Sequence, residues 1–218
     1  MKLKNVLDTS KGRIFFCSDL HYGHSRIIEM NPDNRPFTNV IEMNEWIEKN
    51  IWGQLRPGDH LFDLGDTFWK TSDIDIKEIL ENIPEGVKLY KIEGNHDPYG
   101  LYHGQAPLRK YYEVIADSLD IIVRDSGKDY MLSLDHYPKV SWNHKPYGSL
   151  MLHGHCHGNI DSYNKSTPDL RVDVGLDGSL CKELNKPMIE FKEILEYFYK
   201  ITDGVDFMKY VKTNSYNL

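Results

Sequence analysis

The stretch "RIFFCSDLH" (residues 13–21) joins a short apolar run to an aspartate and a histidine. The run is apolar and rich in residues that favour strands, which predicts a buried β-strand. Asp19 and His21 follow this strand directly. In open α/β sheets, functional sites lie in the crevice outside the carboxyl ends of the strands. The stretch therefore predicts a strand that carries two candidate ligands to one edge of a sheet.

The same pattern recurs four more times along the chain. Polar side chains follow the strand-like runs "HLFDLG", "VKLYKIE", "YMLSLD" and "GSLMLHG"; in chain order they are Asp66, then Asn95, His96 and Asp97, then His136, then His155 and His157. Each motif alone has an ordinary explanation, since "SDLH" can cap a short helix, "GNHD" is a common turn composition and one histidine suits a loop. All five at strand ends favour a metal site, because imidazole and oxygen donors suit borderline divalent metals.

The last motif, "HGHCH" (residues 153–157), packs three histidines and a cysteine into five positions. In an extended chain, side chains alternate between faces, so His153, His155 and His157 would point one way and Cys156 the other. Two or three histidines cannot complete a coordination shell. The remaining ligands must therefore come from the other strand ends.

The composition limits the class of protein. The chain has 218 residues, a length that fits one domain spanning residues 1–218. A formal charge of −7 argues against a long nucleic acid as partner, because backbone binding needs clustered lysine and arginine. Three cysteines without a CxxC motif give no disulfide framework, and no apolar run suits a signal peptide or a membrane span. We expect a reduced, soluble, cytoplasmic protein with no membrane partner.

The order of the predicted elements indicates a mixed α/β domain. Helices are predicted over residues 39–52, 73–83 and 191–201, and further strands over residues 119–135, as a hairpin around Ser-Gly, and over residues 170–175. Asn39 and Glu42 form a predicted capping box. Strand and helix alternate early and strands dominate later, which suggests more than one sheet. The tail, residues 202–218, has no assigned role.

The ordered motifs DxH, GD, GNHD, H and GHxH resemble those of the calcineurin-like metallophosphoesterases. The segments "NRPF", "EMNEWI" and "VDVGLDG" followed by "KP" look like a short bacterial and phage branch of that superfamily. The resemblance covers residues 13–195. It implies a four-layer αββα sandwich of two mixed β-sheets flanked by helices, which the pattern of elements alone does not predict.

The resemblance also implies a ligand set for two divalent metal ions. One ion would be held by Asp19, His21, Asp66 and His157, and the other by Asp66, Asn95, His136 and His155, with Asp66 as the bridge. His153 then becomes a structural residue and Cys156 a packed one. Manganese is the favoured metal, with iron, zinc or nickel as alternatives.

The chemistry implied by the resemblance is attack of a metal-bridging hydroxide on phosphorus. His96 would protonate the leaving oxygen, or else only stabilise its turn; Asp97 would orient His96, or else only shape that turn. Many relatives carry an acid or arginine soon after the GD, but "GDTFWK" has no acid. Arg35 and Asn95 are predicted substrate contacts, with a surface salt bridge as the alternative for Arg35. His24 has no assigned role.

The predicted substrate is a nucleotide-like or small organic phosphodiester. Aromatic residues lie near the motifs and either stack on a base or pack the loops; they are Phe68, Trp69, Tyr99, Tyr102, Trp142 and Tyr147. The alternatives are a phosphomonoesterase acting on a metabolite or phosphoprotein, and a non-catalytic scaffold, as in a retromer subunit that resembles this family.

Overall fold

Two five-stranded sheets form the centre of the computed structural model, which describes residues 1–97 and 108–214. The first sheet has the order β10 (Ile189–Glu190), β2 (Ile14–Cys17), β3 (His60–Asp63), β4 (Lys88–Ile92) and β5 (Tyr112–Ala116). The second has the order β1 (Lys2–Asp8), β6 (Ser118–Asp125), β7 (Lys128–Asp135), β8 (Leu150–His153) and β9 (Arg171–Asp173).

Both sheets are mixed. In the first sheet, β2 to β5 run parallel and β10 pairs antiparallel with β2. In the second, β6 and β7 form the predicted antiparallel hairpin, whereas β1 is parallel to β6, and β7, β8 and β9 are parallel to one another. The carboxyl ends of β2, β3 and β4 therefore share one edge of the first sheet, and those of β7, β8 and β9 share one edge of the second.

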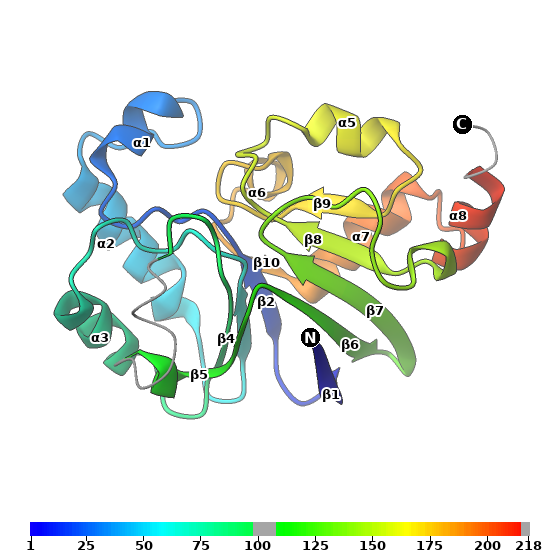
Figure 1. Ribbon diagram of the computed structural model, residues 1–218, viewed down its shortest axis with the longest axis horizontal. Coiled ribbons are helices and arrows are strands. Elements are labelled where there is room, and N and C mark those ends of the chain that lie inside the picture. Colours follow the sequence, from blue (N-terminus) through cyan, green and yellow to red (C-terminus); the bar gives the residue numbers. More distant parts are fainter. Residues whose placement is uncertain (98–107, 215–218) are drawn as a thin grey trace.

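Helices cover the outer faces of both sheets (Figure 1). On the side of the first sheet lie α1 (Ser25–Met30), α2 (Val40–Asn50) and α3 (Asp73–Glu81). On the side of the second lie α5 (Asp161–Ser166), α6 (Ser179–Leu184), α7 (Phe191–Ile201) and α8 (Phe207–Asn214). Short 3₁₀ turns occur at Trp52–Gln54, Arg109–Tyr111 and Lys145–Tyr147. The predicted αββα sandwich is confirmed.

The core is divided by the first sheet. Strand β2 is buried on both faces: Phe15 and Cys17 pack with the α1–α3 helices, whereas Ile14 and Phe16 belong to the larger cluster that also contains the second sheet. This alternation follows from the period of two along a strand. It explains why β2 is apolar throughout, as expected of a parallel strand covered on both sides.

Some local predictions are confirmed and others are refined. Helix α2 begins after Asn39, whose side chain accepts hydrogen bonds from the N–H groups of Ile41 and Glu42. The Glu42 carboxylate accepts from Thr38 N–H, one residue before the position that a capping box requires. The tail contributes α8, where Phe207 packs against Tyr199. Across residues 1–97 and 108–214, no helix has the length and apolar character to cross a bilayer.

Candidate metal centre

The loops that follow the strands of both sheets meet at one end of the sandwich. A parallel bridge between Ser18 and Gly175 joins the end of β2 to the end of β9, and Leu176 N–H donates to the Ser18 carbonyl at 3.1 Å. The two sheets are therefore linked by main-chain hydrogen bonds beside the predicted ligands.

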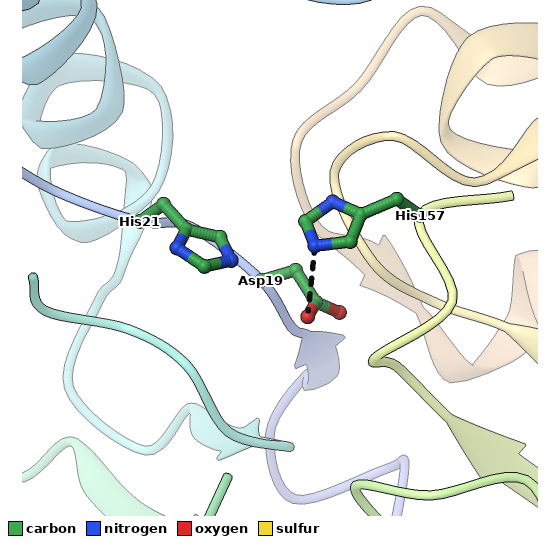
Figure 2. Close-up of side chains that lie close together, drawn as sticks. All are labelled: Asp19, His21 and His157. Carbon is green, nitrogen blue, oxygen red and sulfur yellow. Dashed lines mark ion pairs between the residues drawn. The ribbon is translucent and has the colours of Figure 1, made fainter. Parts of the chain in front are cut away.

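Asp19, His21 and His157 form a first group of candidate ligands. Asp19 and His21 come from the loop after β2, and His157 comes from the turn after β8 (Figure 2). One ligand atom from each residue lies within 4.8 Å of the others, and His157 Nε2 is 3.8 Å from Asp19 Oδ1. Asp19 and His157 are 138 positions apart in the chain. The structure thus brings together distant residues that were predicted to bind one metal ion.

Asp66, His136 and His155 form a second group with the same spacing. His136 Nε2 lies 3.4 Å from Asp66 Oδ2 and 3.2 Å from Asn95 Oδ1, which places the Asn95 amide oxygen beside this group. Asp66 Oδ2 is also 4.0 Å from His21 Nε2 in the first group. A single carboxylate oxygen of Asp66 therefore faces both groups, as a bridging ligand would.

Hydrogen bonds hold one atom of each buried ligand and leave another facing the site. Asp19 Oδ2 accepts from His155 N–H at 2.9 Å, and Asp66 Oδ1 accepts from His96 N–H at 2.8 Å. His136 Nδ1 lies 2.9 Å from the Leu64 carbonyl, so this nitrogen carries a proton, and Nε2 is the nitrogen that faces Asp66 and Asn95 in the site. These contacts fix the orientation of the side chains before any metal binds.

The backbone at the ligands is strained. Asp19, His21, Asp66, His155 and His157 all have φ between 48° and 67°, the left-handed region that residues other than glycine rarely occupy. Each such residue costs on the order of 1–3 kcal/mol unless its surroundings impose the conformation, and clustering of this kind is typical of functional sites.

This strain corrects the prediction of an extended "HGHCH" segment. Strand β8 ends at His153, and the chain then turns through His155 and His157, which have φ of 67° and 48°. The two histidines consequently enter different ligand groups instead of sharing one strand face. Period-two alternation fails here because it applies only while the chain remains extended.

The remaining two side chains of that segment have structural environments. His153 is fully buried; its Nδ1 lies 2.9 Å from the Gly154 carbonyl and its Nε2 3.0 Å from Asn164 Nδ2. Burial lowers the pKa of His153 to about 4, so the ring is neutral. Burial also raises the pKa of the Cys156 thiol to about 11, which keeps it protonated at neutral pH. The buried position of His153 agrees with the structural role that the resemblance implied, whereas Cys156 is only partly buried.

Two atoms in the first group test whether a cation fits. Asp19 Oδ1 and His21 Nε2 are buried and have no hydrogen-bond partner in the part of the chain that the structure describes. Such atoms are costly unless something else satisfies them. Burial raises the pKa of Asp19 to about 7 and lowers that of His21 to about 3. A carboxylate oxygen and a neutral imidazole nitrogen are suitable donors for a divalent metal ion, so the residues fit the group.

Asp177, to which the sequence analysis gave no role, orients His157. Its Oδ2 accepts from His157 Nδ1 at 2.6 Å, which directs Nε2 toward Asp19. Burial alone would raise the pKa of Asp177, but the hydrogen bond from His157 and the charge of Arg35 hold it below its usual value. Asp177 lies in the loop after β9. Searching for polar residues after the predicted strand at residues 170–175, as was done for the other strands, would have identified it.

Arg35 is placed differently from its prediction. The side chain is 1% exposed, and its guanidinium donates to both oxygens of Asp177 at 2.9 Å. It also donates to the main-chain carbonyls of Asp19, at 2.6 Å, and Leu20, at 2.8 Å. This geometry does not support a phosphate contact; Arg35 forms a salt bridge, as the alternative held, but the pair is buried and not at the surface. Arg35 instead ties the loop after β2 to the loop after β9.

Replacing Asp177 with asparagine tests this linkage. We expect metal affinity to fall about 10- to 100-fold, as it does when residues that orient metal ligands are lost. Because the Arg35 charge would remain buried without its partner, we also expect the free energy of unfolding to fall by about 3–5 kcal/mol. Chelator competition and urea unfolding of the metal-free protein measure the two effects. Asp129→Asn, which breaks an exposed Arg124 pair, is the control and should change neither; unchanged metal affinity in Asp177→Asn would contradict the orienting role.

Asp97 supports the loops and does not contact the His96 ring. Its Oδ2 accepts from the N–H groups of Asp66, at 2.9 Å, and Gly94, at 2.8 Å, and pairs with Lys91 Nζ at 2.9 Å. The structure therefore favours the alternative in which Asp97 shapes the turn over a catalytic assignment. Lys91 is fully buried and also pairs with Asp63, a structural cluster that the sequence analysis missed.

His96 is exposed at the rim of the site. Its ring centroid lies 5.6 Å from that of His21 and 4.5 Å from that of Trp69. Of the other predicted aromatic contacts, Phe68 and Trp142 are buried and pack the loops, whereas Tyr147 is exposed. Tyr99 and Tyr102 lie outside the described residues.

The two-sheet sandwich and its joined loops bring together two groups of aspartate and histidine side chains suited to divalent metal ions. The family model described as calcineurin-like phosphoesterase matches residues 12–195, so the chain belongs to this family. It is 31% identical over 170 residues to the uncharacterized protein MJ1445 of Methanocaldococcus jannaschii, covering 76% of this chain and 83% of that protein. It is 28% identical over 182 residues to the Gene 66 protein of Mycobacterium phage D29, covering 75% and 87%.

A solved structure shares the fold. The protein of unknown function AQ665 from Aquifex aeolicus aligns with a TM-score of 0.60 and 24% identity, covering 85% of this chain and 99% of that one. At this identity the likeness concerns the fold alone. The resemblance on which the ligand set was predicted is supported by the family match.

Proposed function

We propose that this protein is a phosphodiesterase that uses two divalent metal ions to hydrolyse a nucleotide-like or small organic phosphodiester. The observation that carries the proposal is Asp66 Oδ2, which lies within 4.0 Å of a histidine nitrogen from each ligand group. Two adjacent groups that share one carboxylate are the arrangement used for in-line displacement at phosphorus.

The residues divide into two sets around that carboxylate. Asp19, His21, Asp66 and His157 would hold one ion, and Asp66, Asn95, His136 and His155 the other. When bound, the pair of ions supplies a nucleophile from water at neutral pH and stabilises the charge that develops on phosphorus. Manganese is the metal that we favour, with iron, zinc or nickel as alternatives.

His96 is the residue that we assign to the leaving group. Its main-chain N–H holds Asp66 Oδ1, so its side chain projects from a fixed point beside the site. An exposed imidazole there can donate a proton to the departing oxygen, which contributes about 10²- to 10⁴-fold in typical enzymes. Asn95, one residue earlier, contributes a neutral oxygen donor and adds no negative charge.

The charge of the site supports an anionic substrate despite the acidic surface. Asp19 and Asp66 are the only carboxylates among the proposed ligands, so two divalent ions leave the site positive. Arg35, the cation predicted to contact phosphate, forms a buried ion pair with Asp177 instead. A diester carries one negative charge and a monoester up to two, so the loss of that cation favours the diester.

A metal-dependent comparison of two chromogenic esters tests the proposal. Protein freed of metal by chelation should hydrolyse neither ester, and manganese should restore hydrolysis with a clear preference for bis-p-nitrophenyl phosphate over p-nitrophenyl phosphate. Iron, zinc, nickel and cyclic nucleotides extend the screen. A preference for the monoester would support the phosphomonoesterase alternative. Binding of two metals without hydrolysis of any ester would support the scaffold.

The proposal includes a cytoplasmic location and a phosphoester as the partner. The three cysteines, Cys17, Cys156 and Cys181, are all free thiols, as a reducing compartment would keep them. The net charge of −7 supports a small substrate over a long nucleic acid.

A further inference from the structure

The ring of His96 is held by packing. Its centroid lies 4.5 Å from that of Trp69, with the rings inclined at 65° in an edge-to-face contact. Among residues 1–97 and 108–214, no side chain hydrogen-bonds to the ring. The neighbouring Asp97 carboxylate accepts hydrogen bonds from main-chain N–H groups and pairs with Lys91. An exposed imidazole normally turns freely about its side-chain bonds; among the described residues, the closest ring contact that favours one orientation of His96 is the one with Trp69, and His21 lies farther away at 5.6 Å.

Trp69 is itself fixed from two sides. Its indole stacks on His24 with a centroid distance of 3.9 Å and an angle of 10°. Its main-chain N–H donates to the Tyr22 carbonyl at 2.8 Å, which ties it to the loop after β2. The indole is half-buried, so it is a rigid surface compared with His96.

His24 connects this stack to the first ligand group. His24 Nδ1 lies 3.3 Å from His21 Nδ1. With His21 Nε2 as the proposed metal ligand, His21 Nδ1 would carry the proton and donate to His24. Four rings therefore form a continuous array, His21, His24, Trp69 and His96, that runs from a candidate ligand to the proposed proton donor.

We propose that Trp69, backed by His24, is the positioning residue that orients His96 toward the leaving group. The proposal rests on the function proposed above and adds to it a residue for which no role was established. An aromatic contact of this geometry favours one ring orientation by roughly 3- to 10-fold. The competing role for Trp69 is a stacking surface for a base in the substrate. One indole face is already covered by His24 and His96 lies against the ring, which favours positioning.

The activity test varies the leaving group of an aryl phosphodiester. A proton donor matters more for phenolate than for p-nitrophenolate, because the poorer leaving group needs the proton. In Trp69→Leu we expect kcat to fall about 3- to 10-fold more for the phenyl ester than for the p-nitrophenyl ester, with KM unchanged. Trp69→Phe should keep most of the activity, and Tyr147→Leu, which removes an exposed aromatic side chain from the loop that precedes β8, is the control. In a His96→Ala background, Trp69→Leu should have no further effect.

A second measurement reads the contact in the metal-free protein without any substrate. Carbon-bound ring protons of His96, labelled with ¹³C-histidine and assigned by comparison with His96→Ala, should be displaced by the ring current of Trp69. In Trp69→Leu this displacement should disappear, while in Tyr147→Leu it should persist.

The outcomes separate the possible explanations. A rise in KM that is equal for all leaving groups would overturn positioning in favour of a base-stacking surface. An unchanged His96 signal in Trp69→Leu would overturn it as well. If the wild-type protein hydrolyses no ester but the His96 signal moves as expected, the proposed function fails while the contact stands. The proposal is supported if Trp69→Leu lowers kcat more for the phenyl ester than for the p-nitrophenyl ester when His96 is present, and has no effect in the His96→Ala background.

Discussion

Asp66→Asn is expected to lose both metal ions and nearly all hydrolysis. The amide keeps the size of the carboxylate, and its oxygen can still accept from His96 N–H. The second position becomes an NH₂ group, which has no lone pair for a metal and faces His21 and His136. We expect kcat/KM to fall roughly 10³-fold or more, which corresponds to about 4 kcal/mol of transition-state stabilisation.

Metal analysis of the purified protein measures this effect directly. The wild type should contain two equivalents of manganese after loading, and Asp66→Asn should contain less than one. Asp129→Asn, an exposed aspartate on the far hairpin, should keep both ions. An Asp66→Asn variant that retained two ions and normal turnover would show that this carboxylate is not the shared ligand.

His96→Ala is expected to separate metal binding from turnover. The main-chain N–H that holds Asp66 survives the substitution, so both ligand groups should keep their geometry. Loss of the imidazole should lower kcat by about 10²- to 10⁴-fold for a diester with a poor leaving group, because the departing oxygen would leave without a proton donor. Metal content should stay near normal.

The control for this variant is a histidine of another loop. His144 is exposed and has φ of 58°, so His144→Asn keeps a residue that tolerates the left-handed conformation. It should alter neither turnover nor metal content. Unchanged turnover in His96→Ala would refute its role as proton donor, and loss of metal would show that the side chain supports the ligands.

Elements with a strong local pattern could be predicted from the sequence, and an element without one could not. The apolar run of β2, the amphipathic α2 and the hairpin of β6 and β7 each carry their own signal in period or turn chemistry. Strand β10 has two residues, and its pairing with β2 is imposed by the distant chain. The element order suggested more than one sheet, and the four-layer sandwich came only with the resemblance; strand order was not predicted, because it depends on contacts that no local pattern records.

The ligands could be predicted in kind, but their supporting residues could not. A polar residue directly after a predicted strand can be placed at the end of the sheet, which is why Asp19 and Asp66 could be predicted as ligands. Arg35 was assigned to phosphate because its chemistry suits phosphate, yet its partner Asp177 lies 142 positions away in the chain. The pairing of Lys91 with Asp63, 28 positions away, was missed because it joins residues of two different strands. Sequence shows what a side chain can bind, whereas the fold determines which partner reaches it first.

Each ligand group takes its members from both sheets. Asp19 and His21 belong to the loops of the first sheet and His157 to those of the second; Asp66 likewise meets His136 and His155 across the divide. Neither half of the sandwich carries a complete group by itself. Exchange of one half for that of another protein would therefore alter both proposed metal sites at once.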